Sequence, residues 1–366
     1  MKRVNIILVG GFCGAGKTTS LVALAKYLTD SGKKIRIIAN EPGSIAVDTE
    51  YMRTCGLEAT EVSGGCFGSN YYKFAEKVNE LCKKGDTDYI LAEAAGCCTD
   101  LRATVMKPVR NGNNSCRLMP LSILIDPVLL MTEIISSGKH LPEDINYLML
   151  KQMEEADILI INKSDILSRT EKVKIEAYLY EKFQEKKILF ISAGKSTDIE
   201  SWMAEIEGMS RSYHIRSKRS LEINYDIYTK AVTGMGFLEL NCELLLKRKV
   251  QGAFLLNAIA DAVKRNFREN NYELAHIKLC IKGSQSMARL NCTGIYRKNN
   301  IARSDYAPIE NGILILQISA FIQAEQLCRI VEQVFDNIIV RDFRATADNK
   351  KIECFMFPLP EPVYRY

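Results

Sequence analysis

The sequence of 366 residues has no apolar run approaching the roughly 20 residues that a membrane-spanning helix requires. The apolar run near its start, in MKRVNIILVGGF, covers only about six residues, fewer than the roughly 7–15 of a secretory signal peptide. The net charge is small, because 49 lysines and arginines are offset by 44 acidic residues, and no long basic stripe interleaved with aromatic residues stands out. These absences predict a cytoplasmic chain that binds neither membranes nor nucleic acid.

Histidine is also scarce, with three in the chain, and no two of them have the spacing of metal ligands. Cysteine, in contrast, is abundant, and its 12 residues are scattered along the chain. Because no secretion signal is recognisable, we expect a reducing compartment. The cysteines are then expected to be free thiols, metal ligands or small core residues.

The chain alternates between short apolar runs and helical patterns up to about residue 195. The expected strands are 5–9, 34–38, 88–92, 121–125, 158–161 and 188–191, and the expected helices include 18–30, 71–83 and 171–183. Several of these strands are apolar on both faces, as parallel strands covered by helices are. The pattern predicts an α/β fold with a doubly wound, mostly parallel sheet, as in P-loop NTPases.

The order of expected strands and helices changes in the second half of the chain. The expected elements there are strands at 236–246, 275–282, 288–293 and 312–319 and helices at 250–269 and 323–335. Their order predicts a smaller α+β domain with a split-βαβ sheet and helices on one face. We therefore expect a first domain at 1–208, a basic linker at 209–230 and a C-terminal domain for client or cofactor interaction at 231–366, with an extended tail.

A phosphate-binding motif, GFCGAGKT, occupies residues 11–18 between an expected strand and an expected helix. Glycines allow backbone amides to converge on phosphate oxygens at the start of a helix, where the helix dipole favours anions. In such a loop Lys17 reaches the β- and γ-phosphates, and the hydroxyl of Thr18 binds Mg²⁺. The residues expected to bind the nucleotide here are Gly11, Cys13, Gly14, Ala15, Gly16, Lys17, Thr18 and Thr19.

A second motif, NKSD, follows the apolar strand at 158–161 and comprises Asn162, Lys163 and Asp165 around a serine. The carboxylate of Asp165 is expected to accept two hydrogen bonds from the N1–H and N2–H₂ groups of guanine, which adenine does not offer. Ser192 and Ala193, after the next strand, are expected to supply a backbone contact to the guanine oxygen. The nucleotide is therefore predicted to be GTP or GDP.

Between these motifs, the apolar strand at 88–92 leads into Glu93, and Gly96 follows three residues later. Glu93 is placed to hold Mg²⁺ or its water shell, and Gly96 to let the backbone approach the γ-phosphate. A solvated acid at the end of a strand is the alternative interpretation of Glu93.

Six motifs follow one another in the first 195 residues: GGFCGAGKTT, NEPGSIAVD, GGCFGSN, ExxG, QMEEADILIINKSD and SA. With these motifs in this order, the segment resembles the CobW/HypB/UreG group of GTPases, and CobW most closely. The resemblance implies a GTPase that helps deliver a metal or metal-containing cofactor to a client metalloenzyme or corrinoid protein. It also implies a homodimer or a client complex assembled around the GTP site.

The sequence departs from this family where CobW-like proteins usually have a Cys-x-Cys-Cys signature. Here the matching residues are Cys66, Phe67, Gly68 and Ser69, so one of three thiols remains. In the second motif Glu41 is a candidate Mg²⁺ ligand, together with Thr18 and Glu93. Asp48 is the candidate that orients the attacking water, which makes Lys17, Asp48 and Glu93 the expected catalytic residues.

A different thiol site is suggested by Cys97 and Cys98, which directly follow Gly96. If their loop meets the loop of Cys66 at the edge of the sheet, soft thiolates would suit Zn²⁺, Co²⁺ or Ni²⁺. The alternative is that these cysteines are small apolar fillers.

The function predicted from all these features is a Mg-dependent GTPase switch for metal or cofactor delivery. Its turnover is expected to be slow without a partner, because no arginine finger is evident. Two alternatives stay open: a GTP-dependent chaperone of a corrinoid (cobalamin) protein that binds little metal itself, and an adaptor that scarcely hydrolyses GTP.

Overall fold

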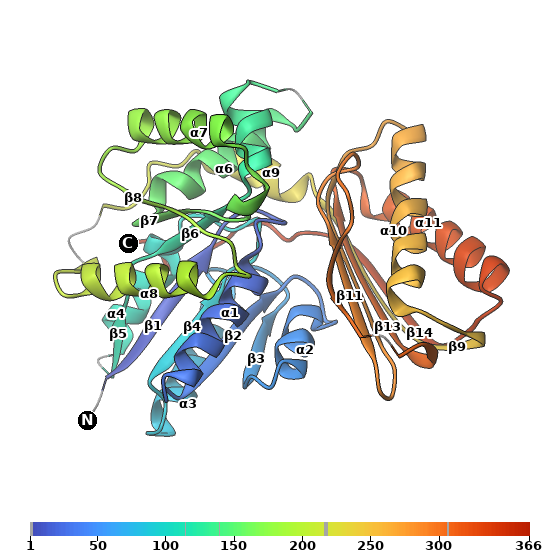
Figure 1. The fold of residues 1–366 in the computed structure, drawn as a ribbon. Coiled ribbons are helices and arrows are strands. Elements are labelled where there is room, and N and C mark those ends of the chain that lie inside the picture. The colour runs from blue at the N-terminus through green and yellow to red at the C-terminus, as the bar shows by residue number, and fades with distance from the viewer. Residues whose placement is uncertain (1–2, 114, 139, 216–218, 306) are drawn as a thin grey trace. The chain divides into compact units, whose positions relative to one another are not determined.

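The structure is a computed structural model that describes residues 3–113, 115–138, 140–215, 219–305 and 307–366. The chain divides into two compact units (Figure 1). The first unit comprises Met1–Val232 and Leu359–Tyr366, and the second comprises Thr233–Pro358. The second unit is therefore an insertion in the chain of the first. This differs from the predicted division, in which the whole of 231–366 formed the C-terminal domain.

The first unit contains, within the described residues, an eight-stranded sheet in the order β3-β2-β4-β1-β6-β7-β8, with β5 paired to β1. Its strands are β1 (Val4–Gly10), β2 (Ile35–Glu41), β3 (Ala59–Ser63), β4 (Tyr89–Glu93), β5 (Cys116–Leu118), β6 (Ser122–Ile125), β7 (Ile158–Ile161) and β8 (Lys187–Phe190). Every pair of neighbouring strands described is parallel. The predicted doubly wound parallel sheet is thus confirmed.

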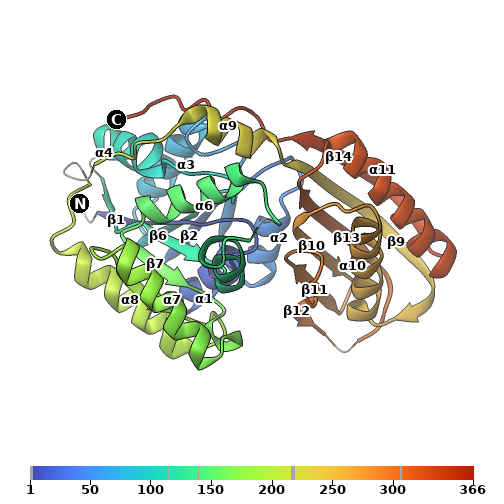
Figure 2. The same ribbon diagram turned by 90° about the horizontal axis from the view of Figure 1, so that it is seen from above.

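Helices cover both faces of this sheet (Figure 2). They are α1 (Lys17–Asp30), α2 (Val47–Thr54), α3 (Tyr71–Lys83), α4 (Lys107–Gly112), α5 (Pro127–Leu129), α6 (Glu143–Glu155), α7 (Arg169–Lys182), α8 (Ser196–Ser210) and α9 (Tyr225–Thr233). On one face, apolar residues of α1 and α8 form a core with the strands, and Trp202 is fully buried in it. Figure 2 shows α3 and α6 on the opposite face. Burial on both faces explains why the strands are apolar without alternation.

The second unit contains, among the described residues, a six-stranded antiparallel sheet in the order β12-β11-β10-β13-β9-β14. Its elements are β9 (Gly236–Val250), α10 (Gly252–Glu269), β10 (Leu274–Lys282), β11 (Met287–Cys292), β12 (Asn300–Ser304), β13 (Ile309–Ala320), α11 (Ala324–Phe335) and β14 (Thr346–Met356). Strand β13 lies between β9 and β10, as expected for a split-βαβ sheet, and α10 and α11 share one core with it. None of the described helices, α10 included, is long and apolar enough to cross a membrane.

The segment predicted to be a basic linker is only partly irregular. Helix α8 extends to Ser210, and α9 buries Tyr228, Ala231 and Val232. The rest of this segment includes residues 216–218, which lie outside the described residues. The apolar face of α9 therefore anchors the end of the expected linker in the first unit.

Candidate functional site

The phosphate-binding loop has the conformation that its motif predicts. Gly16 precedes α1 with a φ of 88°, in the left-handed region that glycine tolerates best. A Cβ atom at Gly16 would lie 2.3 Å from Nδ2 of Asn162, so a side chain has no room there. The ammonium of Lys17 is buried within the loop and donates hydrogen bonds to the carbonyl oxygens of Gly11 (2.8 Å) and Phe12 (3.3 Å). Lys17 thus lies in the loop that is expected to bind the phosphates.

Two of the predicted Mg²⁺ ligands lie together at the end of β4. The hydroxyl of Thr18 donates a hydrogen bond of 2.8 Å to Oε1 of Glu93, and both side chains are buried. A hydroxyl oxygen beside a carboxylate is a hard-oxygen donor set of the kind that Mg²⁺ prefers. The arrangement of these residues therefore fits the ion.

The third predicted ligand, Glu41, is bound to the start of α2. Its Oε1 accepts hydrogen bonds from the backbone amides of Asp48 (3.0 Å) and Thr49 (2.9 Å) and from the Thr49 hydroxyl (3.2 Å). A carboxylate at a helix N-terminus is favoured by the helix dipole. Glu41 and Asp48 are thus neighbours, and their roles toward Mg²⁺ and water stay predictions.

The NKSD segment is tied directly to the phosphate-binding loop. Asn162 Nδ2 donates to the carbonyl of Ala15 (2.8 Å). Lys163 Nζ donates to the carbonyl of Gly14 (2.7 Å) and to Oδ2 of Asp126 (2.8 Å). Asp165 follows in a short 3₁₀ turn, Ser164–Ile166, with an exposed side chain. The two predicted nucleotide motifs are therefore joined by side-chain contacts.

The loop after β8 lies beside this segment. The amide of Ser164 donates to the carbonyl of Ile191 (2.9 Å), which places the start of the Ser192–Ala193 pair next to the NKSD turn. The amide of Ser192 donates to Oδ2 of Asp198 (2.8 Å). Since that amide is already engaged, the amide of Ala193 is the better candidate for a contact with the guanine oxygen.

Gly96 brings the loop after β4 against the phosphate-binding loop. A Cβ atom at this position would lie 2.6 Å from Sγ of Cys13 and 2.8 Å from its backbone nitrogen. Real Cβ atoms do not approach other atoms so closely, so the contact requires glycine. The segment from Gly96 to Asp100, here named the Gly96 loop, therefore packs directly on the loop expected to bind phosphates.

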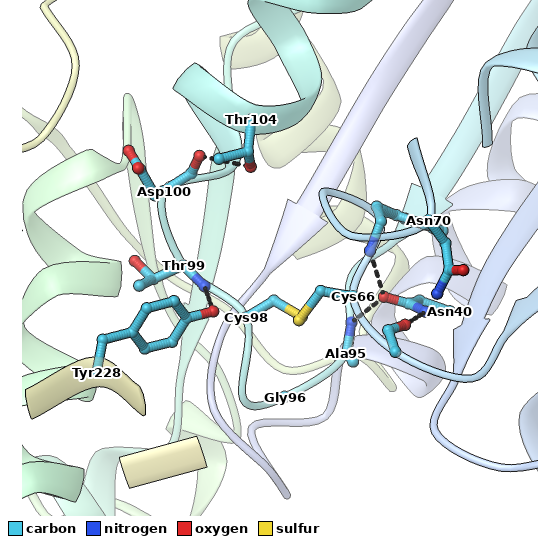
Figure 3. Close-up of a disulfide and its surroundings, with 12 residues drawn as sticks. Asn40, Cys66, Asn70, Ala95, Gly96, Cys98, Thr99, Asp100, Thr104 and Tyr228 are labelled. Carbon is cyan, nitrogen blue, oxygen red and sulfur yellow. Dashed lines mark hydrogen bonds between the residues drawn. A yellow bond between two sulfur atoms is a disulfide. The ribbon is translucent and has the colours of Figure 1, made fainter. Parts of the chain in front are cut away.

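The expectation that the cysteines are free thiols, metal ligands or small core residues is wrong for two of them in this structure. Cys66 and Cys98 form a disulfide, although 32 residues separate them in the sequence (Figure 3). The sulfur atoms of Cys66, Cys97 and Cys98 all lie within 4.8 Å of one another, and all three residues are buried. The two loops thus do meet, which was the condition for the alternative thiol site, and they bring three sulfur atoms together.

A residue that the sequence analysis did not single out, Asn40, connects these two loops. Its Nδ2 donates to the carbonyls of Val62 (3.1 Å) and Gly65 (2.6 Å). Its Oδ1 accepts from the amides of Phe67 (3.1 Å) and Ala95 (3.4 Å), one from each of the two loops. Figure 3 shows Asn40 and Ala95 close to the disulfide. The sequence feature that could have identified Asn40 is its position at the end of an apolar strand, directly before Glu41.

Burial governs the electrostatics of this region. It raises the pKa of the Cys97 thiol well above its ordinary value, and the neighbouring Cys13 adds to the effect. Burial also raises the pKa of Glu155, at the end of α6, to about 8, and the charge of Asp100 adds to it. Glu155 accepts a hydrogen bond from the hydroxyl of Thr99 (3.0 Å) in the Gly96 loop. Burial therefore favours the protonated form of a carboxyl group that is hydrogen-bonded to this loop.

We expect Glu155 to make the protein less stable as the pH rises from about 4.5 to about 8. In this range the folded protein keeps a proton that the unfolded chain has lost, so the free energy of unfolding falls with increasing pH. Urea unfolding at pH 5.5 and pH 7.5 should show that Glu155→Gln reduces this fall by about 2.5 kcal/mol, because the slope is about 1.4 kcal/mol per pH unit and lessens near the pKa. Glu154→Gln, at the exposed neighbouring position, is the control and should behave as the wild type. Equal pH dependence in all three proteins would contradict the expectation.

Comparison with known proteins places the chain in a family. Residues 5–190 match the family model described as CobW/HypB/UreG, nucleotide-binding domain. The zinc chaperone YeiR of Escherichia coli is 30% identical over 172 residues, which are 45% of this chain and 47% of the relative. The zinc chaperone CobW of Pseudomonas aeruginosa is 24% identical over 206 residues (48% and 53%), and the urease accessory protein UreG of Ureaplasma parvum is 30% identical over 176 residues (45% and 74%).

The chain therefore contains a P-loop nucleotide-binding domain, which is the class of domain predicted from its motifs. More particularly, the chain belongs to the CobW/HypB/UreG family, as its sequence resemblance implied. The chain spans about half the length of the two zinc chaperones that it matches.

Proposed function

We propose that this protein is a Mg-dependent GTPase switch that carries a transition metal ion and delivers it to a client protein. The observation that supports this most is the meeting of three cysteine sulfurs, two of which belong to the Gly96 loop that packs on the phosphate-binding loop. The names of the two zinc chaperones and of the urease accessory protein agree with such a role. The switch and the cargo site would then share one loop.

In the proposed hydrolysis, Lys17 and the backbone amides of the phosphate-binding loop stabilise the negative charge that develops on the β–γ bridge oxygen. Thr18 and Glu93 would hold Mg²⁺, which neutralises phosphate charge when it is bound. Asp48 remains the candidate that orients the attacking water. The carboxylate of Asp165 would select guanine.

The proposed cargo site consists of Cys66, Cys97 and Cys98 in their reduced form. Thiolates are soft ligands that suit Zn²⁺, Co²⁺ or Ni²⁺. Because all three residues are buried, cargo enters or leaves only when the loops move, which makes delivery dependent on loop conformation. The cluster also restores three thiols where the sequence motif had lost two, so it favours a metal cargo over a corrinoid cargo.

We expect the reduced protein to bind Zn²⁺ and the disulfide form to bind it at least tenfold more weakly. A disulfide removes the thiolates of Cys66 and Cys98, which leaves one thiol of the cluster. Equilibrium dialysis with Zn²⁺, with and without a phosphine reductant, measures this difference. Cys66→Ser should weaken binding about 10- to 100-fold even under reduction, since loss of outer-shell partners alone costs that much. Cys55→Ser, outside the cluster, is the control, and Zn²⁺ binding independent of both Cys66 and reduction would refute this cargo site.

The switch itself is tested by zinc release to a chromophoric chelator from the reduced, zinc-loaded protein. We expect different release rates with GTP, a non-hydrolysable GTP analogue and GDP, each in Mg²⁺ buffer. Phosphate release measured in the same samples reports hydrolysis. Identical zinc release in all three nucleotides would contradict the proposed delivery function, and hydrolysis absent even with added clients would favour a nucleotide-bound adaptor.

A further inference from the structure

The Gly96 loop contacts both chain segments that connect the first unit to the second. The chain leaves the first unit after Val232, at the end of α9, and returns to it at Leu359. Both segments are part of the first unit and bind the same short stretch of the Gly96 loop, residues 99–100. The contacts on each side involve side chains that the proposed reaction does not use.

The outgoing segment is α9, and two of its tyrosines bind the Gly96 loop. The backbone amide of Thr99 donates to the hydroxyl oxygen of Tyr228 (3.3 Å), as Figure 3 shows, and Tyr228 is buried. The hydroxyl of Tyr225 donates to Oδ2 of Asp100 (2.9 Å). The outgoing segment thus holds two successive residues of the loop.

The returning segment is residues 359–366, and its Arg365 binds the same carboxylate of Asp100. Its Nε donates to Oδ2 of Asp100 (2.6 Å), and its Nη2 donates to the carbonyl of Leu221 (2.7 Å). The amide of Val363 donates to the carbonyl of Gly68 (3.0 Å), two residues after Cys66. The returning segment therefore contacts both loops that contain cysteines of the cluster.

Asp100 is the residue on which these contacts converge. It is almost fully buried and has a φ of 57°, which is uncommon for residues other than glycine. At the opposite end of the loop, Gly96 packs on Cys13. Gln152 Nε2 holds the stretch between them by donating to the carbonyls of Gly96 (3.0 Å) and Cys98 (2.9 Å). The loop is thus a continuous, short link from the phosphate-binding loop to both connecting segments.

We infer that Arg365, Tyr225 and Tyr228 are positioning residues that couple the nucleotide state of the Gly96 loop to the two segments leading into and out of the second unit. A change at Gly96 that accompanies GTP binding displaces Thr99 and Asp100, and this alters the anchoring of residues 359–366 and of α9. By reciprocity, a client that acts on the second unit changes the nucleotide site through the same contacts. This inference rests on the proposed function, because it assumes that GTP and GDP bind the phosphate-binding loop.

Hydrogen–deuterium exchange of the full-length reduced protein tests this coupling. In the wild type, we expect exchange of the peptide covering residues 359–366 to differ at least threefold between GDP and a non-hydrolysable GTP analogue. In Arg365→Ala, exchange of this peptide should rise about tenfold and become equal in the two nucleotides, because its ionic anchor on Asp100 is lost. Arg169→Ala, an exposed arginine of the first unit, is the matched control and should keep the nucleotide-dependent difference.

A second variant, Tyr228→Phe, keeps the ring in the core and removes only the oxygen that accepts from Thr99. It should abolish the nucleotide-dependent difference in α9 without changing GDP affinity, a result that a purely structural role would not give. Exchange in the wild type that is the same in both nucleotides would overturn the inference. A separate titration with fluorescent GDP distinguishes this outcome from failure of the proposed function, in which no guanine nucleotide binds at all.

Discussion

Replacing Asp165 with asparagine is expected to weaken GTP binding about 100- to 10,000-fold and to make xanthosine triphosphate the preferred nucleotide. The carboxylate would accept two hydrogen bonds from guanine. A hydrogen bond to a charged group contributes about 1.5–3 kcal/mol of binding free energy, and every 1.4 kcal/mol changes the affinity about tenfold. An asparagine amide presents a donor to the guanine amino group. Xanthine has an oxygen at that position, so it matches the amide.

Competition against a fluorescent GDP analogue in Mg²⁺ buffer measures both affinities. The geometry supports the prediction because Asn162 and Lys163, in the same motif, are hydrogen-bonded to the phosphate-binding loop. Asp30→Asn, at the exposed end of α1, is the control and should leave both affinities unchanged. GTP affinity that survives in Asp165→Asn would show that another group reads the base.

The parallel sheet and its edge could be predicted because its central strands are buried on both faces. Such strands are apolar throughout, and each functional segment follows one of them directly, as Asn162 follows β7. Two edge strands, β3 and β14, lack this signal. In β3 only Val62 is buried, and most of β14 is solvent-exposed, so both strands were missed. The short helix α2 was missed as well, since eight residues give too little periodicity.

The meeting of Cys66 and Cys98 could be expected only conditionally from the sequence. Strand β2 lies between β3 and β4 and is parallel to both, so the loops after β3 and β4 leave the sheet at the same edge. However, the precise approach depends on Asn40, whose side chain binds both loops. No spacing pattern in the sequence encodes a contact between residues that are 32 positions apart. The return of residues 359–366 to the first unit was missed for the same reason, because it depends on tertiary contacts such as that of Arg365 with Asp100.

Lys17→Ala is expected to lower the rate of GTP hydrolysis about 100- to 1000-fold, the range found when a preorganised donor to a developing charge is removed. Lys17 is the cation of the phosphate-binding loop itself, and its ammonium already lies among the loop carbonyls of Gly11 and Phe12. Its position is therefore fixed by the loop, which reduces the reorganisation needed when GTP binds. Lys26→Ala, on the exposed face of the same helix, should hydrolyse GTP like the wild type. Phosphate release at saturating GTP compares the three proteins, and a Lys17→Ala rate above one tenth of the wild-type rate would mean that hydrolysis occurs elsewhere or by another mechanism.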